Sequence, residues 1–358
     1  MKRQETPDFT RLLLKWNELK NDRQMPWKAE KDPYKIWLSE IILQQTRVEQ
    51  GLAYYNRYIK KYPAIQKLAA APEPDVFKLW EGLGYYTRCK NLIATARFIS
   101  KELDGIFPAT YEDILKLKGI GPYTAAAIAS FAFNLPHAVV DGNVMRVLAR
   151  YFGISKAIDS TEGKKYFAKL ANELLDKDSP ASYNQAIMDF GATVCKPQQP
   201  LCSTCMLKKN CVAFNKKAVD KFPIKEKRLV KKHRWVYYLV AEYKNAFYIR
   251  KRVAKDIWQN LHEFVLVEKE KHVEPKTILT MPEIKNIIGN EYELKNISGI
   301  YKQVLTHQVI HGCFIHVQLN KKISLNGYEL VELSKLKRLA FPRLLNTYFE
   351  QDGQAVFG

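Results

Sequence analysis

The sequence lacks any apolar run long enough to cross a lipid bilayer. Its longest apolar stretch lies around Thr124–Phe133, well short of the roughly 20 apolar residues that a membrane-spanning helix requires. The polar start, MKRQETPDFT, is also unlike a secretory signal peptide. These absences predict a protein that acts away from membranes, and we expect it in the cytoplasm of a bacterium, associated with the nucleoid.

Acidic residues are scarce relative to basic ones. The 358 residues include 57 Lys and Arg but only 37 Asp and Glu, which gives a formal net charge of +20. Contacts to nucleic-acid phosphates release condensed counterions, so an excess of this size favours a polyanion as the partner. Extra lysine for solubility is the alternative explanation, but solubility requires a smaller net charge.

Cysteine is rare, and its distribution is uneven. Of the six cysteines, Cys195, Cys202, Cys205 and Cys211 fall within one short segment. An oxidised secreted domain spreads its cysteines more evenly, so this pattern indicates a reducing compartment and a metal centre held by four thiolates. The unequal gaps of Cys-x6-Cys-x2-Cys-x5-Cys fit a [4Fe-4S] cluster better than structural zinc, which usually has two separated pairs of ligands.

Other residues in and around this pattern have simpler interpretations. Cys89 and Cys313 stand alone in the sequence and are expected to be ordinary buried thiols. Lys208 and Lys209 lie inside the cysteine loop. They either present positive charge to a phosphate or are solvated surface lysines, and the sequence favours neither interpretation.

Secondary-structure patterns divide the chain into two parts. Up to about Phe214, apolar residues recur every three or four positions between prolines and glycines, which indicates short helices. A stretch rich in Lys and Arg follows, and then come runs typical of strands and one helical pattern at 332–341. The strand-like runs begin at Trp235, Ala246, Phe264 and Val309. We therefore predict a mainly α domain at 1–213, a basic linker at 214–232 and an α+β domain at 233–358.

The segment LKGIGPYTAAAI at 117–128 predicts a hairpin between two helices. Gly119 and Gly121 permit a tight turn with positive φ, and Pro122 suits the first position of the following helix. The amides of this turn and helix start form a site for an anion such as a DNA phosphate. A purely structural turn is the alternative, and the flanking helices and basic composition favour phosphate binding.

Two carboxylates, Glu40 and Asp141, have contrasting sequence surroundings. Glu40 falls on the apolar stripe of its expected helix, where burial would raise the pKa of the carboxyl group, unless it is only a tolerated glutamate at the edge of the stripe. Asp141 precedes a helix and is at least a cap, where amide hydrogen bonds favour the ionised form. Such a pair suits glycosidic bond cleavage, because one group donates a proton and the other stabilises a cationic sugar.

These motifs together resemble the endonuclease III superfamily of DNA glycosylases and, within it, the MutY family of adenine DNA glycosylases. The resemblance rests on SEIILQQTRV at 39–48, GLGYYTRCKNL at 82–92, GIGPYTAAAI at 119–128, VDGNVMRV at 140–147 and the cysteine loop. It covers most of the first 211 residues in the family's order. It implies removal of undamaged adenine mispaired with 8-oxoguanine or guanine in double-stranded DNA.

The resemblance also assigns roles to individual residues. Glu40 would protonate adenine, Asp141 would stabilise the cationic sugar, and Tyr123 and Asn143 would assist them. The helix near the extruded base would include Gln45 and Thr46, and Tyr85 would wedge beside the orphaned partner base, offsetting the cost of base extrusion. Without the resemblance, Gln45 and Thr46 would be interpreted as a polar helix face, and Tyr85 as part of the core packing. The adenine pocket would include Trp27, Lys28 and Gln185.

The hairpin distinguishes between two mechanisms. Bifunctional relatives carry a lysine nucleophile on the helix after the turn, and the corresponding residue here is Tyr123, which cannot form an imine. The resemblance therefore implies a monofunctional enzyme that leaves an abasic site. Lys116 and Lys118 lie nearby in the sequence, so the sequence does not exclude weak lyase activity.

The C-terminal part resembles the Nudix-like domain with which this family recognises 8-oxoguanine. The segment NLHEF at 260–264 looks like a degraded form of the family's Gly-x-Trp-Glu-Phe segment. No Nudix metal-binding motif is found, so phosphohydrolase activity is not expected. Thr306 and His307 stand where the family commonly has Ser-His, and this departure leaves the strength of 8-oxoguanine selectivity open. A histidine in a satisfied core is the alternative for His307.

Two other functions compete with this interpretation. One is a bifunctional endonuclease III-like enzyme acting on oxidised pyrimidines, which Tyr123 and the second domain argue against. The other is a non-catalytic iron–sulfur DNA-binding protein, which the presence of both Glu40 and Asp141 argues against. In the favoured interpretation, the protein is a monomer whose partner is mispaired duplex DNA.

Overall fold

Contacts within the chain divide it into two units. The first unit comprises residues 1–69 and 94–228, and the second comprises 70–93 and 229–358. The computed structural model describes residues 5–226 and 230–352, so part of the expected linker at 214–232 lies outside the described residues. The domain boundaries at 213 and 233 stay predictions. The sequence pattern gives no sign that residues 70–93 group with the C-terminal part.

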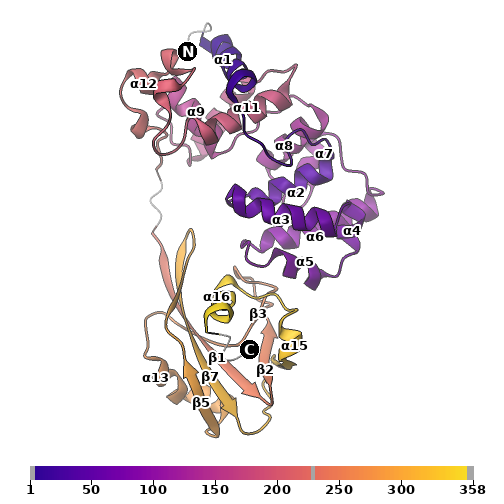
Figure 1. The fold of residues 1–358 in the computed structure, drawn as a ribbon, viewed down its shortest axis with the longest axis vertical. Coiled ribbons are helices and arrows are strands. Elements are labelled where there is room, and N and C mark those ends of the chain that lie inside the picture. Colours follow the sequence, from indigo (N-terminus) through magenta and orange to yellow (C-terminus); the bar gives the residue numbers. More distant parts are fainter. Residues whose placement is uncertain (1–4, 227–229, 353–358) are drawn as a thin grey trace. The chain divides into compact units, whose positions relative to one another are not determined.

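The first unit is built from helices, as the apolar periodicity predicts (Figure 1). Its α-helices are α1 (Glu5–Lys20), α2 (Pro33–Leu43), α3 (Val48–Lys61), α4 (Ile65–Ala70), α7 (Tyr111–Lys116), α8 (Pro122–Phe133), α9 (Gly142–Phe152), α10 (Thr161–Leu174), α11 (Pro180–Thr193) and α12 (Val212–Asn215). Short 3-10 turns at Cys202–Thr204, Lys208–Asn210 and Val219–Lys221 follow α11. Helix α6 (Thr87–Glu102) spans the division between the two units.

Polar side chains fix where several of these helices begin. The hydroxyl groups of Thr110 and Ser160 cap α7 and α10, and the carboxylate of Asp141 caps α9. Such side chains satisfy backbone N–H groups that have no partner within the helix, which is worth about 1 kcal/mol per cap. The positions of the helix starts are therefore encoded locally in the sequence.

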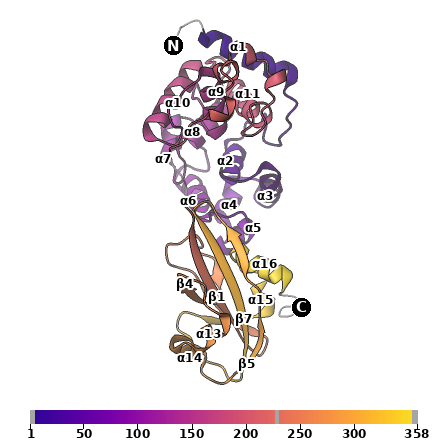
Figure 2. The ribbon, with the colours of Figure 1, turned by 90° about the vertical axis from the view of Figure 1, so that its left-hand side faces the viewer.

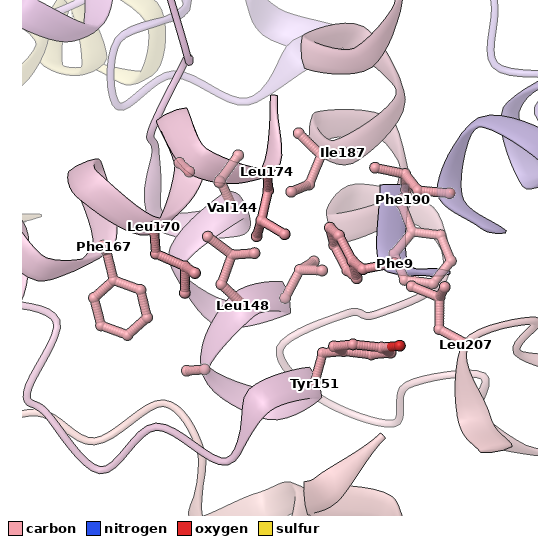
Figure 3. Close-up of a cluster of buried hydrophobic side chains, with 14 of the residues drawn as sticks. Phe9, Val144, Leu148, Tyr151, Phe167, Leu170, Leu174, Ile187, Phe190 and Leu207 are labelled. Atoms are coloured by element: carbon pink, nitrogen blue, oxygen red, sulfur yellow. The ribbon is translucent and has the colours of Figure 1, made fainter. Parts of the chain in front are cut away.

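One hydrophobic cluster packs α1, α9, α10 and α11 together (Figure 3). Phe9, Leu148, Phe167 and Phe190 are almost completely buried within it. Three of the four clustered cysteines pack against this core, as do Val140 and Met145 beside Asp141. The core thus holds the cysteine loop and the start of α9 in one rigid framework.

The hairpin between α7 and α8 forms as predicted, with one difference. Gly119 has a φ of 79°, which favours glycine, but Gly121 has a φ of −100°, which any residue adopts. Pro122 occupies the start of α8, as expected. Only the first glycine is therefore required by the backbone of the turn.

The second unit contains a mixed sheet of eight strands. They are β1 (Lys232–Tyr243), β2 (Ala246–Lys251), β3 (His262–Glu263), β4 (Val265–Lys269), β5 (Tyr292–Ile297), β6 (Tyr301–Val304), β7 (Gln308–Leu319) and β8 (Glu329–Glu332). The long strands β1 and β7 lie parallel at the centre, and the other pairings are antiparallel. This mixed sheet confirms the predicted α+β class.

Helices cover both faces of this sheet (Figure 2). On one face, α13 (Pro275–Thr280) and α14 (Pro282–Ile288) pack against Tyr237 and Ile315. On the other, Tyr348 of α16 (Arg343–Gln351) stacks on Phe314 with ring centroids 4.0 Å apart. Alternate residues of β1 and β7 thus face different helices, as the two-residue period of a strand requires.

The end of the chain differs from its predicted structure. The helical pattern at 332–341 forms only the four-residue α15 (Leu333–Leu336), because the following segment instead contacts α5 (Glu73–Trp80). There, Lys78 donates a hydrogen bond to the Leu339 carbonyl, and Glu81 accepts one from the Phe341 amide. Among the described residues, no helix is long and apolar enough to cross a membrane.

Candidate active site

A cavity of about 440 Å³ opens in the first unit between α2, α8, the start of α9 and α11. Its size is typical of sites for small organic groups. Eight residues singled out from the sequence line it together: Trp27, Lys28, Glu40, Thr46, Tyr123, Asp141, Asn143 and Gln185. The fold therefore brings residues from four separate segments of the chain to one place.

Glu40 lies on α2 and is only 6% exposed. Burial, together with the charge of Asp141, raises the pKa of Glu40 from 4.5 to about 7, and a hydrogen bond with Tyr123 acts in the opposite direction. Burial also raises the pKa of Tyr123 well above 10. Tyr123 therefore stays protonated at neutral pH, and Glu40 is balanced between its acid and carboxylate forms.

Asp141 occupies the N-cap of α9, as the sequence pattern allowed, and it also faces the cavity. Its Oδ1 accepts a hydrogen bond from the Val144 amide at 2.7 Å, and its Oδ2 accepts one from Asn143 Nδ2 at 2.7 Å. The cap and the cavity-facing carboxylate are thus one and the same group. A carboxylate bonded in this way is held in a fixed orientation by its two hydrogen bonds.

A buried arginine connects Asn143 to the cysteine loop. The Nη2 of Arg146 donates to Asn143 Oδ1 at 2.8 Å and to the Gly191 carbonyl at 2.7 Å. The Nε of Arg146 donates to the Cys195 carbonyl at 2.9 Å. A Cβ atom on Gly191 would meet the Cβ of Asn143 at 2.8 Å, so glycine permits this close approach. The orientation of Asp141 is therefore linked through Asn143 and Arg146 to the first cysteine.

The four cysteines surround one small apolar recess beside the hydrophobic core. Cys195, Cys202, Cys205 and Cys211 line it together and are free thiols. Burial raises the pKa of Cys205 to about 11 in the absence of a bound metal. Soft thiolate ligands of this kind suit an iron–sulfur cluster or zinc, so the type of donor atom, though not its arrangement around a single ion, fits a metal centre. Within the described ranges, no three His, Cys, Asp or Glu side chains are grouped as ligands of a single metal ion.

Arg150 supports this cysteine loop from inside. Its side chain is 3% exposed and donates to the Lys196, Pro197, Val219 and Phe222 carbonyls. Its Nη1 also lies 3.5 Å from the Cys195 sulfur. A guanidinium in this position offers positive charge to a cluster of thiolates.

Two further residues singled out from the sequence meet in the second unit. The hydroxyl of Tyr85 lies 2.8 Å from the Thr306 hydroxyl. Tyr85 has a left-handed backbone with a φ of 50°, and 45% of it is exposed. His307 is also exposed rather than part of the core, which contradicts its alternative interpretation.

The segment that resembles Gly-x-Trp-Glu-Phe is structural in this chain. Glu263 is fully buried and forms ion pairs with Arg250 and Arg252. Its carboxylate is thereby occupied within the protein.

Sequence patterns missed several residues on which this geometry depends. Arg146 and Gly191 were not singled out, and neither was Asp189, a fully buried carboxylate of α11. Arg146 lies on α9, a strongly amphipathic helix, among buried neighbours such as Val147. A basic residue on an apolar helix face was the available signal.

Comparisons with known proteins agree with this site. The sequence profile of the "HhH-GPD superfamily base excision DNA repair protein" family matches residues 38–174. The adenine DNA glycosylase of Buchnera aphidicola subsp. Schizaphis graminum is 35% identical over 312 residues, covering 87% of this chain and 88% of that relative. The adenine DNA glycosylase of Mus musculus is 42% identical over 217 residues, covering 58% of this chain and 42% of that relative.

Solved structures show the same fold in the helical part. A thermostable thymine-DNA glycosylase superposes with a TM-score of 0.55 at 30% identity, covering 60% of this chain and 98% of that structure. An endonuclease III–DNA complex, 21% identical, superposes with a TM-score of 0.53 over 61% of this chain and 98% of that structure, and it shows the fold alone. With 35% identity across nearly nine-tenths of both chains, this chain belongs to the adenine DNA glycosylase family of the HhH-GPD superfamily of base excision DNA repair proteins.

Proposed function

We propose that the protein hydrolyses the N-glycosidic bond of adenine mispaired with 8-oxoguanine or guanine in duplex DNA and leaves an abasic site. It would act as a monomer on DNA in the bacterial cytoplasm. The observation that carries this proposal is the pair of unlike carboxyl groups on one cavity. Glu40 is buried with a pKa near 7, and Asp141 is held by two hydrogen bonds.

Glu40 is the general acid in this proposal. Cleavage of the bond leaves negative charge on the departing base, and protonation of the base removes that charge. A carboxyl group with an ordinary pKa would hold almost no proton at neutral pH, whereas a pKa of about 7 keeps a large fraction of Glu40 protonated. The Tyr123 hydrogen bond orients the group.

Asp141 is the electrostatic partner. The sugar becomes cationic as the base leaves, and a fixed carboxylate stabilises that charge without reorganising. Asn143 holds one oxygen of Asp141. Because the residue at the start of α8 is Tyr123 rather than a lysine, no amine is placed there to form a Schiff base, so water completes the reaction and the enzyme is monofunctional.

The α7–α8 hairpin is the proposed phosphate site. A Cβ on Gly121 would meet no heavy atom within 4 Å, and its φ of −100° needs no glycine. Nothing inside the described protein therefore explains the absence of a side chain at Gly121, but close approach of a DNA phosphate to the amides at the start of α8 would. Gln45 has a left-handed φ of 55°, and Thr46 lines the cavity. Both contact DNA near the extruded base in this proposal.

Trp27, Lys28 and Gln185 form the proposed adenine pocket. All three line the cavity that contains the two carboxyl groups. Trp27 packs edge-on against Tyr55, with ring centroids 5.4 Å apart. This contact fixes an aromatic wall against which a planar base can pack.

In the second unit, Tyr85 and Thr306 are the proposed reader of 8-oxoguanine, with His307 beside them. Tyr85 would wedge next to the orphaned base, and its left-handed backbone presents the ring outward. The guanidinium of Arg88 lies 5.4 Å from the centroid of this ring and supports it through a cation–π contact. The hydroxyl pair of Tyr85 and Thr306 can exchange its mutual hydrogen bond for one to the damaged base. We propose on this basis that 233–358 is the Nudix-like recognition domain.

Cys195, Cys202, Cys205 and Cys211 would hold a [4Fe-4S] cluster, whose contribution is to shape the surrounding loop. Arg150 and Arg146 connect that loop to α9. Lys208 donates to the Ser203 carbonyl, which restrains the loop that carries Lys208 and Lys209. No step of base removal involves the cysteines, because the chemistry is at Glu40 and Asp141.

Base removal is tested with duplexes that carry adenine opposite 8-oxoguanine, guanine or thymine, and with duplexes that carry oxidised thymine. Strand breaks should occur at adenine opposite 8-oxoguanine or guanine, and only after alkali treatment. Glu40→Gln and Asp141→Asn should each reduce the single-turnover rate at least about 10³-fold, while duplex affinity stays near that of the parent. Parent-like rates in both variants refute the assignment. Breaks at oxidised thymine without alkali would instead identify a bifunctional enzyme.

The rate of base removal should depend on pH through Glu40. The protonated acid is the active form, and its pKa is raised to about 7, so the rate is highest below this pH and falls about tenfold per unit above it. Single-turnover rates between pH 5.5 and 9 measure this alkaline limb. Tyr123→Phe removes the hydrogen bond that lowers the pKa of Glu40, so its limb should move to higher pH. A rate that stays flat up to pH 9 rules out Glu40 as the acid.

Selectivity for 8-oxoguanine should depend on the hydroxyl of Thr306. Thr306→Val keeps the shape but removes the hydrogen bond, which is worth about 1 kcal/mol. The ratio of rates for adenine opposite 8-oxoguanine and opposite guanine should fall about fivefold to tenfold, with little change on guanine. Thr347→Val, on α16, is the matched control. An unchanged ratio in Thr306→Val removes this residue from the reader.

Purified protein should contain about four irons per chain and show the broad visible absorbance of an iron–sulfur cluster. Cys202→Ala should lose both signals and most of the duplex affinity, because the loop is no longer held in place. Cys89→Ala, outside the loop, should retain both. Zinc without iron in the parent would contradict the cluster assignment.

A further inference from the structure

A buried carboxylate outside the catalytic pair anchors one wall of the cavity. Asp189 lies on α11 and is 0% exposed. Its Oδ1 accepts a hydrogen bond from Arg23 Nη1 at 2.7 Å, and its Oδ2 accepts one from Asn21 Nδ2 at 2.9 Å. Lys28 Nζ lies 3.4 Å from the same Oδ2. A single carboxylate thus gathers two cations and one amide.

All three partners belong to the segment that joins α1 to α2. This segment supplies a large part of the cavity wall, and its lining residues are Arg23, Met25, Trp27, Lys28, Ala29, Glu30 and Lys31. Helix α2, which follows directly, carries Glu40. The conformation of the segment therefore determines both the shape of the pocket and the approach to the acid.

The backbone of this segment contributes little to holding it in place. The backbone–backbone hydrogen bonds within it are local, such as that from the Lys28 amide to the Met25 carbonyl at 3.0 Å. Ala29 has a left-handed φ of 68°, a conformation that must be enforced by surrounding contacts. Lys28 Nζ also donates to the Arg23 carbonyl at 2.9 Å. The contacts to Asp189 are thus the ionic part of a long-range attachment that also includes the hydrogen bond from Lys31 Nζ to the Phe131 carbonyl at 3.0 Å and the ring contact between Trp27 and Tyr55.

A buried carboxylate without such partners would be strongly unfavourable, and removing its charge leaves the partly buried cations Arg23 and Lys28 uncompensated. The attachment is consequently sensitive to a change as small as Asp to Asn. Asp189 is also one helical turn after Gln185, which lines the same cavity. One helix therefore supplies a side chain that lines the cavity and the anchor of the segment 21–31.

We propose that Asp189 is a positioning residue that preforms the base pocket by fixing the segment 21–31 through Arg23 and Lys28. This inference rests on the proposed function, because the base that enters the cavity is adenine in that proposal. Asp189 touches neither the base nor the reacting atoms. Its contribution is to spare the enzyme the cost of ordering the wall when the base arrives.

The test compares two duplexes that differ only in whether a base can enter the pocket. One carries 2′-fluoro-2′-deoxyadenosine, whose glycosidic bond resists cleavage, and the other carries a stable abasic analogue, both opposite 8-oxoguanine. Asp189→Asn should bind the fluoroadenosine duplex about tenfold more weakly, as expected for loss of about 1.4 kcal/mol, and bind the abasic duplex like the parent. Asp22→Asn makes the same charge change at an exposed residue of the same segment and should match the parent on both.

Arg23→Gln tests the same attachment from a less buried position, since the Arg23 side chain is 22% exposed, and keeps the test valid if Asp189→Asn fails to fold. Arg23→Gln should likewise weaken binding of the fluoroadenosine duplex and leave binding of the abasic duplex unchanged. Equal loss on both duplexes, or parent-like affinity for both in the two variants, would overturn the proposal. Failure of the parent to release adenine would refute the proposed function instead, and fluoroadenosine binding still reports on the anchor in that case.

Discussion

The hydrogen bonds around the Asp141 carboxylate are the constraint on which the rest of the site depends. This one group caps α9, faces the cavity and raises the pKa of Glu40 through its charge. Its two oxygens are directed by the Val144 amide and the Asn143 side chain. Removing the cap would therefore disturb the start of the helix, the anionic side of the site and the protonation of the acid together.

The two carboxyl groups differ because the fold places them in different local environments. Glu40 sits on a helix whose neighbours Trp37 and Ile41 are buried, so its charged form is poorly solvated. Asp141 receives an amide and a side-chain N–H group in place of water. Proximity then reinforces the difference, since the charge on one group disfavours charge on the other. In the function that we propose, a proton donor and an anion thus coexist in one cavity at neutral pH.

Sequence reasoning anticipated the parts of this structure that are encoded locally. The capping position of Asp141, Pro122 at the start of α8 and the four-cysteine loop are each determined by a few adjacent residues. The apolar stripe of α2 left two interpretations of Glu40 open, a buried carboxyl group or a tolerated glutamate at the edge of the stripe, and the structure shows the buried group. The residues that gather at the cavity were anticipated mainly through the resemblance, since no local pattern relates Trp27 to Gln185.

What the sequence could not predict depends on contacts between distant segments. Arg146 matters because it reaches Gly191 and Cys195, and Asp189 matters because it reaches Arg23. No periodicity reveals such partners. The predicted helix at 332–341 was mostly wrong for the same reason, because its last residues bind Lys78 of α5 and Glu81, the residue that follows this helix, instead.

Helix α11 collects most of these long-range contacts. Asn184 is fully buried, and its side chain binds the Val139 amide and the His137 carbonyl, which holds the segment that leads into Asp141. One or more turns later, Asp189 holds the pocket wall and the Gly191 carbonyl holds Arg146. The helix ends at Thr193, directly before the cysteine loop.

A rigid cysteine loop therefore has a mechanical consequence for a site it does not touch. The Cys195 carbonyl accepts a hydrogen bond from Arg146. The Cys195 amide donates one to the Phe190 carbonyl at 2.8 Å, and this bond connects the cysteine loop to the end of α11. If the loop moved, α11 would lose its fixed end, and the anchors at Asn184, Asp189 and Gly191 would move with it. In our proposal, a metal centre at these cysteines would therefore support base removal by fixing α11, while taking no part in the chemistry.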